Sequence, residues 1–109
     1  MKLCCIDIGT NSTIFLLSNI NLKGCINPLY FQIENTRIGK NIKKTKILHK
    51  KLISNTIDKI SKNLPKADKY IIVGTSALRE AKNKSEFKKH LYKKTGLKLK
   101  ILTINEEAS

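Results

Sequence analysis

The residues best suited to chemistry lie in one polar segment near the start of the chain, Asp7–Thr13. Gly9 allows the backbone to approach a ligand closely, and consecutive N–H groups in a turn form a concavity that binds anions. Asp7 would repel phosphate, so we expect it to orient water or a metal ion. The same residue types are common in ordinary hairpin turns, so the residues alone favour a phosphate loop and a plain turn equally. The donors after the glycine are Thr10, Asn11, Ser12 and Thr13.

A second polar segment, Gly74–Arg79, follows a short apolar run and opens a predicted helix. Thr75 or Ser76 is suited to cap that helix, and the N–H groups of a helix start favour an anion. Arg79, about one turn in, can present two parallel N–H donors to a phosphate. The simpler interpretation is a capped helix with a surface arginine, and the segment alone leaves both open.

Two adjacent glutamates, Glu106 and Glu107, form a third candidate. Neighbouring side chains point in different directions from a helix start, so one can face a cleft as a general base while the other faces solvent. Acidic residues are also favoured at helix starts by the helix dipole, and this simpler interpretation is the commoner one.

The first third of the chain predicts the strands that must hold the first segment. Apolar and β-branched runs at 3–8, 13–17 and 25–33 are separated by turn residues. This order predicts an antiparallel meander. Pro28 places the third strand near a sheet edge or at the strand start, because proline lacks a backbone N–H.

The rest of the chain changes to helical periodicity. Polar residues 34–46 read as a loop, and apolar residues three and four apart from Leu48 to Leu64 predict a helix that begins at Thr45 or Lys46. Later strands reached through helices should run parallel to the first strand. The remaining predicted elements are a strand at 70–73, helices at 77–82 and about 85–95 with Gly96 as C-cap, a strand at 97–102, and a helix start at 105–108.

The net charge and the cysteine content limit which classes of function are expected. The net charge of +14 attracts polyanions, although surface lysines can also simply solvate helices. Three cysteines without a CxxC pair argue against a disulfide framework and a zinc site, and we expect them to be small buried hydrophobes. No apolar run is long enough to span a membrane, and no signal peptide is evident, so a membrane partner is not expected and the cytoplasm is the predicted location.

Taken together, four segments resemble one protein family: Ile6–Ser12, Thr36–Gly39, Gly74–Asn83 and Asn105–Ala108. In order and spacing, the sequence is similar to the N-terminal part of the exopolyphosphatase and guanosine pentaphosphate phosphohydrolase family. That family belongs to the superfamily of actin-like, sugar-kinase-like and Hsp70-like ATPases. The first motif resembles the whole superfamily, whereas the third and fourth resemble this family in particular.

The resemblance implies a role for each candidate residue. Glu107 would be the carboxylate that activates the attacking water, and Glu106 its non-catalytic neighbour. Family members release the terminal phosphate of polyphosphate or of guanosine pentaphosphate with Mg²⁺. The residues implied in substrate binding are Asp7, Gly9, Thr10, Asn11, Ser12, Thr75, Ser76 and Arg79.

The resemblance also implies the fold. We expect an α/β fold: the N-terminal half-domain of the actin-like ATPase (ribonuclease H-like) fold, in the order βββαβαβ with the final helix truncated and a mixed five-stranded sheet. Residues 1–109 would form the phosphate-binding half. The family's second half-domain, with a second phosphate loop and residues that hold the metal, has no counterpart in this sequence.

Three functions therefore stay open. The chain is expected to be part of a phosphohydrolase that is inactive alone, whose partners are the substrate, a second half-domain chain or a homodimer partner. A non-catalytic polyphosphate- or nucleotide-binding module is the second reading. A truncated gene product is the third, and its sign would be an exposed apolar sheet face.

Overall fold

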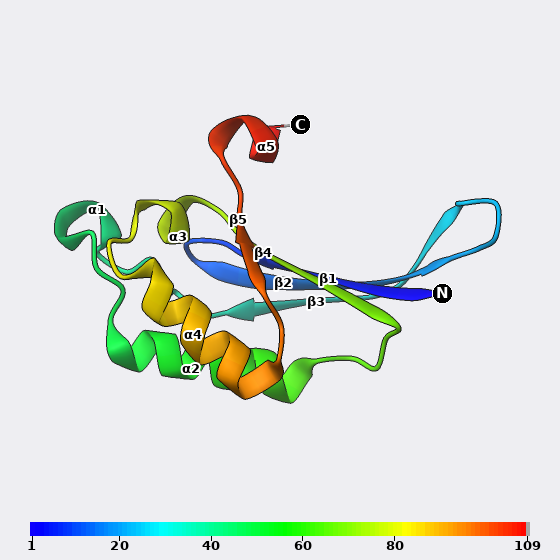
Figure 1. The fold of residues 1–109 in the computed structure, drawn as a ribbon, viewed down its shortest axis with the longest axis horizontal. Helices are drawn as coiled ribbons and strands as arrows, with labels where there is room; N and C mark the ends of the chain where they lie inside the picture. Colours follow the sequence, from blue (N-terminus) through cyan, green and yellow to red (C-terminus); the bar gives the residue numbers. More distant parts are fainter. Residues whose placement is uncertain (109) are drawn as a thin grey trace.

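The apolar runs form one mixed sheet in the computed structural model. The structure describes residues 1–108, the last two without their side chains. The sheet order is β3-β2-β1-β4-β5 (Figure 1). The first three strands are antiparallel, and β4 and β5 run parallel to β1, so the predicted mixed five-stranded sheet is confirmed. The strands are β1 (Lys2–Ile8), β2 (Ser12–Ile20), β3 (Ile26–Asn35), β4 (Lys69–Gly74) and β5 (Leu99–Ile101).

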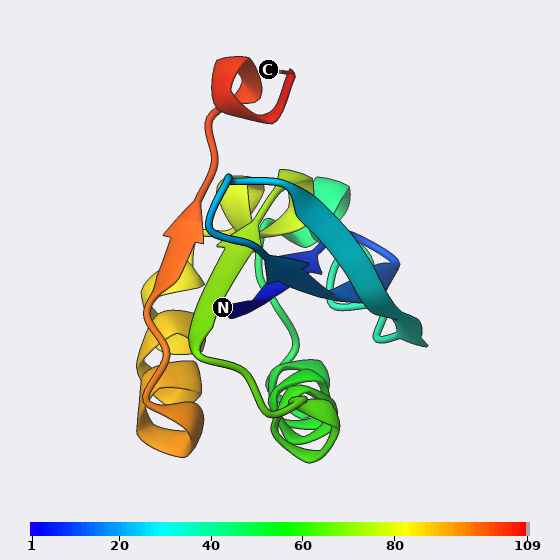
Figure 2. The same cartoon turned by 90° about the vertical axis from the view of Figure 1, so that its right-hand side faces the viewer.

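The longer helices cover one face of this sheet. Their bounds, with those of the short helices, are α1 (Ile42–Thr45), α2 (Lys50–Asn63), α3 (Ser76–Glu80), α4 (Lys84–Thr95) and α5 (Ile104–Ala108). α2 and α4 pack beside each other against the sheet, while α5 stands away from the rest beyond the end of β5 (Figures 1 and 2). The buried core lies between, with alternate strand residues meeting the helices. Its members include Cys4, Ile6, Ile8, Phe15, Ile53, Ile57, Phe87 and Leu91.

The opposite sheet face is apolar and exposed. Phe31 pairs with Leu16, Leu16 with Cys5, and Cys5 with Ile71, so these side chains form a row across four strands. Phe31 is 59% exposed and Ile71 40%, and Ile33 two residues along is 54% exposed. Parallel strands are usually covered on both faces, whereas the face that carries Phe31 and Ile71 is open here.

The segment between β3 and α2 corrects two predictions. Residues 34–46 do not form a plain loop, because β3 runs to Asn35 and α1 buries Ile42. The second helix begins at Lys50, after Leu48. Leu48 is buried but non-helical because the side chain of Asn83 binds its backbone: Leu48 N–H donates to Oδ1 at 2.9 Å, and Nδ2 donates to Leu48 O at 3.0 Å.

Several smaller predictions are settled as well. Pro28 does lie in an edge strand, and Gly96 does end α4 in the left-handed conformation with φ 76°. The cysteine prediction is wrong in part: Cys4 is buried, but Cys5 is half-buried and Cys25 exposed, because Cys25 lies in the turn before β3. Within residues 1–108, no helix has the length and apolar character to cross a membrane; the cytoplasmic location stays a prediction.

Candidate functional site

Three strand ends meet at one edge of the sheet. β1, β4 and β5 are parallel, so their carboxyl ends at Ile8, Gly74 and Ile101 lie together. The backbone ties them: Thr75 N–H donates to Ile8 O at 3.2 Å, and Leu102 N–H donates to Gly74 O at 2.9 Å. Ligands of open α/β sheets bind outside the carboxyl ends of the strands. All three sequence-predicted segments follow these strands, so the structure brings them to the same edge.

The loop after β1 turns tightly and is held by backbone hydrogen bonds from the segment that follows β3. Gly9 N–H donates to Ser12 O at 2.9 Å. The carbonyl of Asn11 accepts N–H donors from Thr36 and Arg37 at 3.2 and 3.0 Å. A phosphate-binding loop must turn its carbonyl oxygens away from the anion, and these contacts engage that oxygen within the protein.

Gly39 packs the supporting segment between the loop and α3. Its N–H donates to Thr10 O at 3.0 Å. A Cβ at Gly39 would stand 2.4 Å from Thr10 Cγ2 and 2.8 Å from Ala77 Cβ. The loop and the first turn of α3 therefore both lie against the same glycine, and only a residue without a side chain fits there.

Asp7 lies on the open sheet face just before the loop. Its strand partners are Ile14 and Val73, and its side chain is exposed. The carboxylate is thus held at the strand end but accessible, as a group that orients water or a cation would be.

Of the two residues expected to cap α3, Thr75 stands at the N-cap, but its side chain makes no capping hydrogen bond. Thr75 is buried and its Oγ1 donates instead to Ile8 O at 3.4 Å, because β1 pairs alongside β4 at this point. Ser76 is half-buried at the same edge. Thr75 therefore fastens α3 to the sheet rather than capping it.

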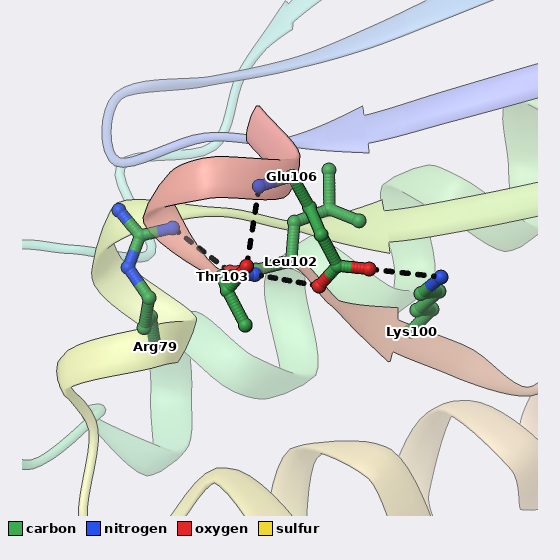
Figure 3. A network of polar contacts seen from close by, with 5 residues as sticks. All are labelled: Arg79, Lys100, Leu102, Thr103 and Glu106. Atoms are coloured by element: carbon green, nitrogen blue, oxygen red, sulfur yellow. Dashed lines mark hydrogen bonds and ion pairs between the residues drawn. The ribbon is translucent and has the colours of Figure 1, made fainter. Parts of the chain in front are cut away.

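Arg79 reaches from α3 to the end of β5. Its Nη1 donates to Leu102 O at 2.9 Å, and Figure 3 shows the guanidinium directed toward that carbonyl. Leu102 is the first residue after β5, and Thr103 separates it from α5. The arginine predicted as a phosphate ligand is thus also a contact of the segment that leads into α5.

Glu106 closes a reciprocal cap at the start of α5. Thr103 N–H donates to Glu106 Oε1 at 3.0 Å, and Glu106 N–H donates to Thr103 Oγ1 at 3.2 Å. Lys100 Nζ lies 3.2 Å from Glu106 Oε2 (Figure 3). The backbone bond from Thr103, then the bond from Lys100, lower the pKa of the Glu106 carboxyl below its ordinary value.

Glu107, the predicted base, follows in α5, but its side chain lies outside the described residues. The structure places Glu106 in the cap of α5, and the role of Glu107 as the base stays a prediction. Sequence reasoning did not single out the partners Lys100, Leu102 and Thr103. Only the Thr103-x-x-Glu106 spacing, which is that of a capping box, could have indicated this contact.

The sheet order and the convergent loop define the class: an α/β half-domain of the actin-like, ribonuclease H-like fold. A model of the Ppx/GppA phosphatase family matches residues 18–109, and the chain belongs to this family. The matched stretch begins within β2, so the loop at Asp7–Thr13 precedes it.

Solved structures match over almost the whole chain. The Ppx/GppA family member of Aquifex aeolicus superposes with a TM-score of 0.89 at 27% identity, covering 98% of this chain and 36% of its own. An exopolyphosphatase from Cytophaga hutchinsonii gives a TM-score of 0.82 at 22% identity, covering 94% of this chain and 34% of its own. The second likeness, at this identity, supports the fold alone.

A curated relative is the bifunctional 3-dehydroquinate synthase/phosphatase of Fusobacterium nucleatum. The two are 31% identical over an alignment of 117 residues. The alignment covers 94% of this chain and 17% of the relative. The chain thus spans about a third of the solved relatives and a sixth of this curated one.

Proposed function

We propose that the chain is the N-terminal, phosphate-binding half of an exopolyphosphatase-like phosphohydrolase. Its substrate would be polyphosphate or guanosine pentaphosphate, from which the terminal phosphate is released. One observation carries the proposal: the loop after β1, Arg79 and the start of α5 share one sheet edge. Membership of the Ppx/GppA phosphatase family supports it.

The residues of this edge would divide the work. The N–H groups and side chains of Thr10, Asn11 and Ser12 would hold phosphate oxygens, because the carbonyl oxygens of these residues already accept hydrogen bonds from the backbone. Thr75 and Ser76 line the same edge, and Arg79 would add a charge-assisted contact. Glu107 would take a proton from the water that attacks the terminal phosphorus, and the shortened phosphate chain would leave.

Mg²⁺ is the metal that we propose for this site. Among residues 1–106, no three His, Cys, Asp or Glu side chains gather as a metal site. Mg²⁺ commonly takes only one or two carboxylates and completes its shell with water and substrate phosphates. Asp7, an accessible hard oxygen donor beside the loop, fits one such position. A bound Mg²⁺ would neutralise phosphate charge there.

The remaining ligands would come from a second half-domain. Hydrolysis needs phosphate, metal and base held together, and residues 1–109 would supply one wall of that site. We propose that the other wall belongs to a second half-domain chain, and that a homodimer is a further assembly to test. The isolated chain is expected to release no phosphate from polyphosphate with Mg²⁺. Robust turnover that disappears in Glu107→Gln would overturn the proposed inactivity and support the base.

Binding tests the phosphate site directly. Calorimetry with tripolyphosphate should give a salt-sensitive affinity that falls about tenfold or more in Arg79→Ala, because a charge-assisted contact contributes roughly 1.5–3 kcal/mol. Lys62→Ala on α2 removes the same charge from the helical layer and is the matched control. If both variants lose the same affinity, tripolyphosphate is held by the general positive charge and not by a site at Arg79.

Two alternatives rest on specific observations. The net charge of +14 favours a binding module for polyphosphate or nucleotides that performs no chemistry. Such a module would bind in the same assay and show no turnover even when the second half-domain is supplied. The exposed apolar row through Phe31 and Ile71 favours a truncated gene product, which would self-associate and bind phosphate weakly.

A further inference from the structure

Leu102 is held from two sides at the junction between β5 and α5. Its N–H donates to Gly74 O at 2.9 Å, which continues the pairing with β4. Its carbonyl accepts Arg79 Nη1 at 2.9 Å, which comes from α3. The peptide units on both sides of Leu102 are thereby fixed to different elements, and the direction in which the chain leaves the sheet depends on both.

The same junction carries the cap of α5. Thr103 and Glu106 bind reciprocally, and Lys100 binds the carboxylate of Glu106 (Figure 3). Both views show α5 standing away from the sheet and the longer helices (Figures 1 and 2). This network therefore contributes to the orientation of α5 relative to β5.

Arg79 links this junction to the loop after β1. Arg79 N–H donates to Thr75 O at 2.8 Å, and Thr75 N–H donates to Ile8 O, the last residue before the loop. Ala77 in the same helix shares with Thr10 the contact surface of Gly39. The helix that carries Arg79 is therefore joined to the start of the loop through Thr75, while the arginine side chain contacts Leu102.

We propose that Arg79 is a positioning residue that couples bound phosphate to the orientation of α5, an inference that rests on the proposed phosphate site. A phosphate oxygen and the Leu102 carbonyl are both acceptors for one planar guanidinium. A guanidinium has several N–H donors, and a bond to a charged acceptor is roughly twice as strong as one to a neutral acceptor, so we expect a phosphate that takes the Nη1 donor to weaken the hydrogen bond to Leu102. The element that carries Glu107 would then respond to the presence of substrate.

The amide spectrum of the ¹⁵N-labelled chain tests this coupling with tripolyphosphate as the probe. In the wild-type chain we expect shifts of the loop amides, Thr10 to Ser12, and of Thr103 and Ile104. In Arg79→Lys, a point charge remains but the fork is lost. The loop amides should still shift, and the response at Thr103 and Ile104 should be lost.

A control separates this route from direct contact of the probe with Lys100. Lys100→Met removes the ion pair with Glu106 but leaves Arg79 and Leu102 unchanged, so Thr103 and Ile104 should still respond. Loss of their response in this variant, or its survival in Arg79→Lys, would overturn the coupling. Loop shifts without any response of α5 in the wild-type chain would overturn the coupling alone, whereas absence of loop shifts would overturn the phosphate site with it.

Discussion

The hydroxyl oxygens of Thr13 and Thr36 lie 3.0 Å apart, and both side chains are buried. Thr13 is the last residue of the polar segment Asp7–Thr13 and lies in β2, and Thr36 begins the segment whose N–H groups hold Asn11 O. The pair thus joins β2 to the support beneath the loop. Burying a hydroxyl without a hydrogen-bond partner costs free energy. Removing only one of these two hydroxyls should therefore lower stability more than removing both.

Thr13→Val should therefore lower the free energy of unfolding by about 1–3 kcal/mol, since it strands the hydroxyl of Thr36. The double variant Thr13→Val/Thr36→Val removes both polar groups at constant shape and should recover most of that loss. Urea unfolding of the four chains measures the coupling energy. Additive losses would show that the two hydroxyls do not depend on each other.

Gly39→Ala should destabilise the chain by about 1–3 kcal/mol, because the new methyl group overlaps Thr10 Cγ2 and Ala77 Cβ. Adding Thr10→Ser removes one of the two obstacles and should restore part of the stability. Thermal unfolding of the single and double variants measures this. If Thr10→Ser gives no recovery, Gly39 does not carry the contact between the loop and α3.

Asn83→Ala should cost about 1–3 kcal/mol, because it leaves the N–H and C=O of Leu48 without their partner. Asn55→Ala, at an exposed position within α2, is the matched control and should leave stability unchanged or raise it by a few tenths of a kcal/mol through helix propensity. Urea unfolding compares them. Similar values for the two variants would refute the role of Asn83 in holding Leu48 outside the helix.

The start of α5 should loosen in acid. The folded chain lowers the pKa of Glu106 below its ordinary value of 4.5, so its stabilising effect is complete above that value and is lost as the pH falls through the lowered pKa. The protection of the Glu106 amide, measured against its intrinsic exchange rate at each pH, should fall over that range. In Lys100→Met, the pKa should rise but stay below 4.5, since the bond from Thr103 N–H remains. An unchanged pKa by NMR titration would contradict the contact with Lys100.

Phe31→Gln should reduce self-association of the chain with little effect on its unfolding. Phe31 is 59% exposed on the uncovered sheet face, and Tyr92 on α4 is 53% exposed on the helical side. Tyr92→Gln is therefore the matched control, and sedimentation velocity measures both. Equal reductions would mean that general surface hydrophobicity, not the sheet face, drives association.

Much of the fold could be predicted from the sequence because its signals are local. The apolar and β-branched runs at 3–8 and 13–17, the helical spacing after Leu48 and the glycine at 96 each reflect the preferences of neighbouring residues. The prediction failed where a distant side chain overrides local preference. Leu48 has helical spacing but stays outside α2, because Asn83, 35 residues away, binds its backbone.

The sequence by itself determined the family resemblance, the mixed sheet and the three polar segments at strand ends. Only the tertiary structure decided how these segments are held. Thr75 binds Ile8 instead of capping α3, and Arg79 binds Leu102 at the junction with α5. Residue types and spacing report local conformation, whereas these contacts depend on the parallel pairing of β1, β4 and β5, which brings together groups that are far apart in the chain.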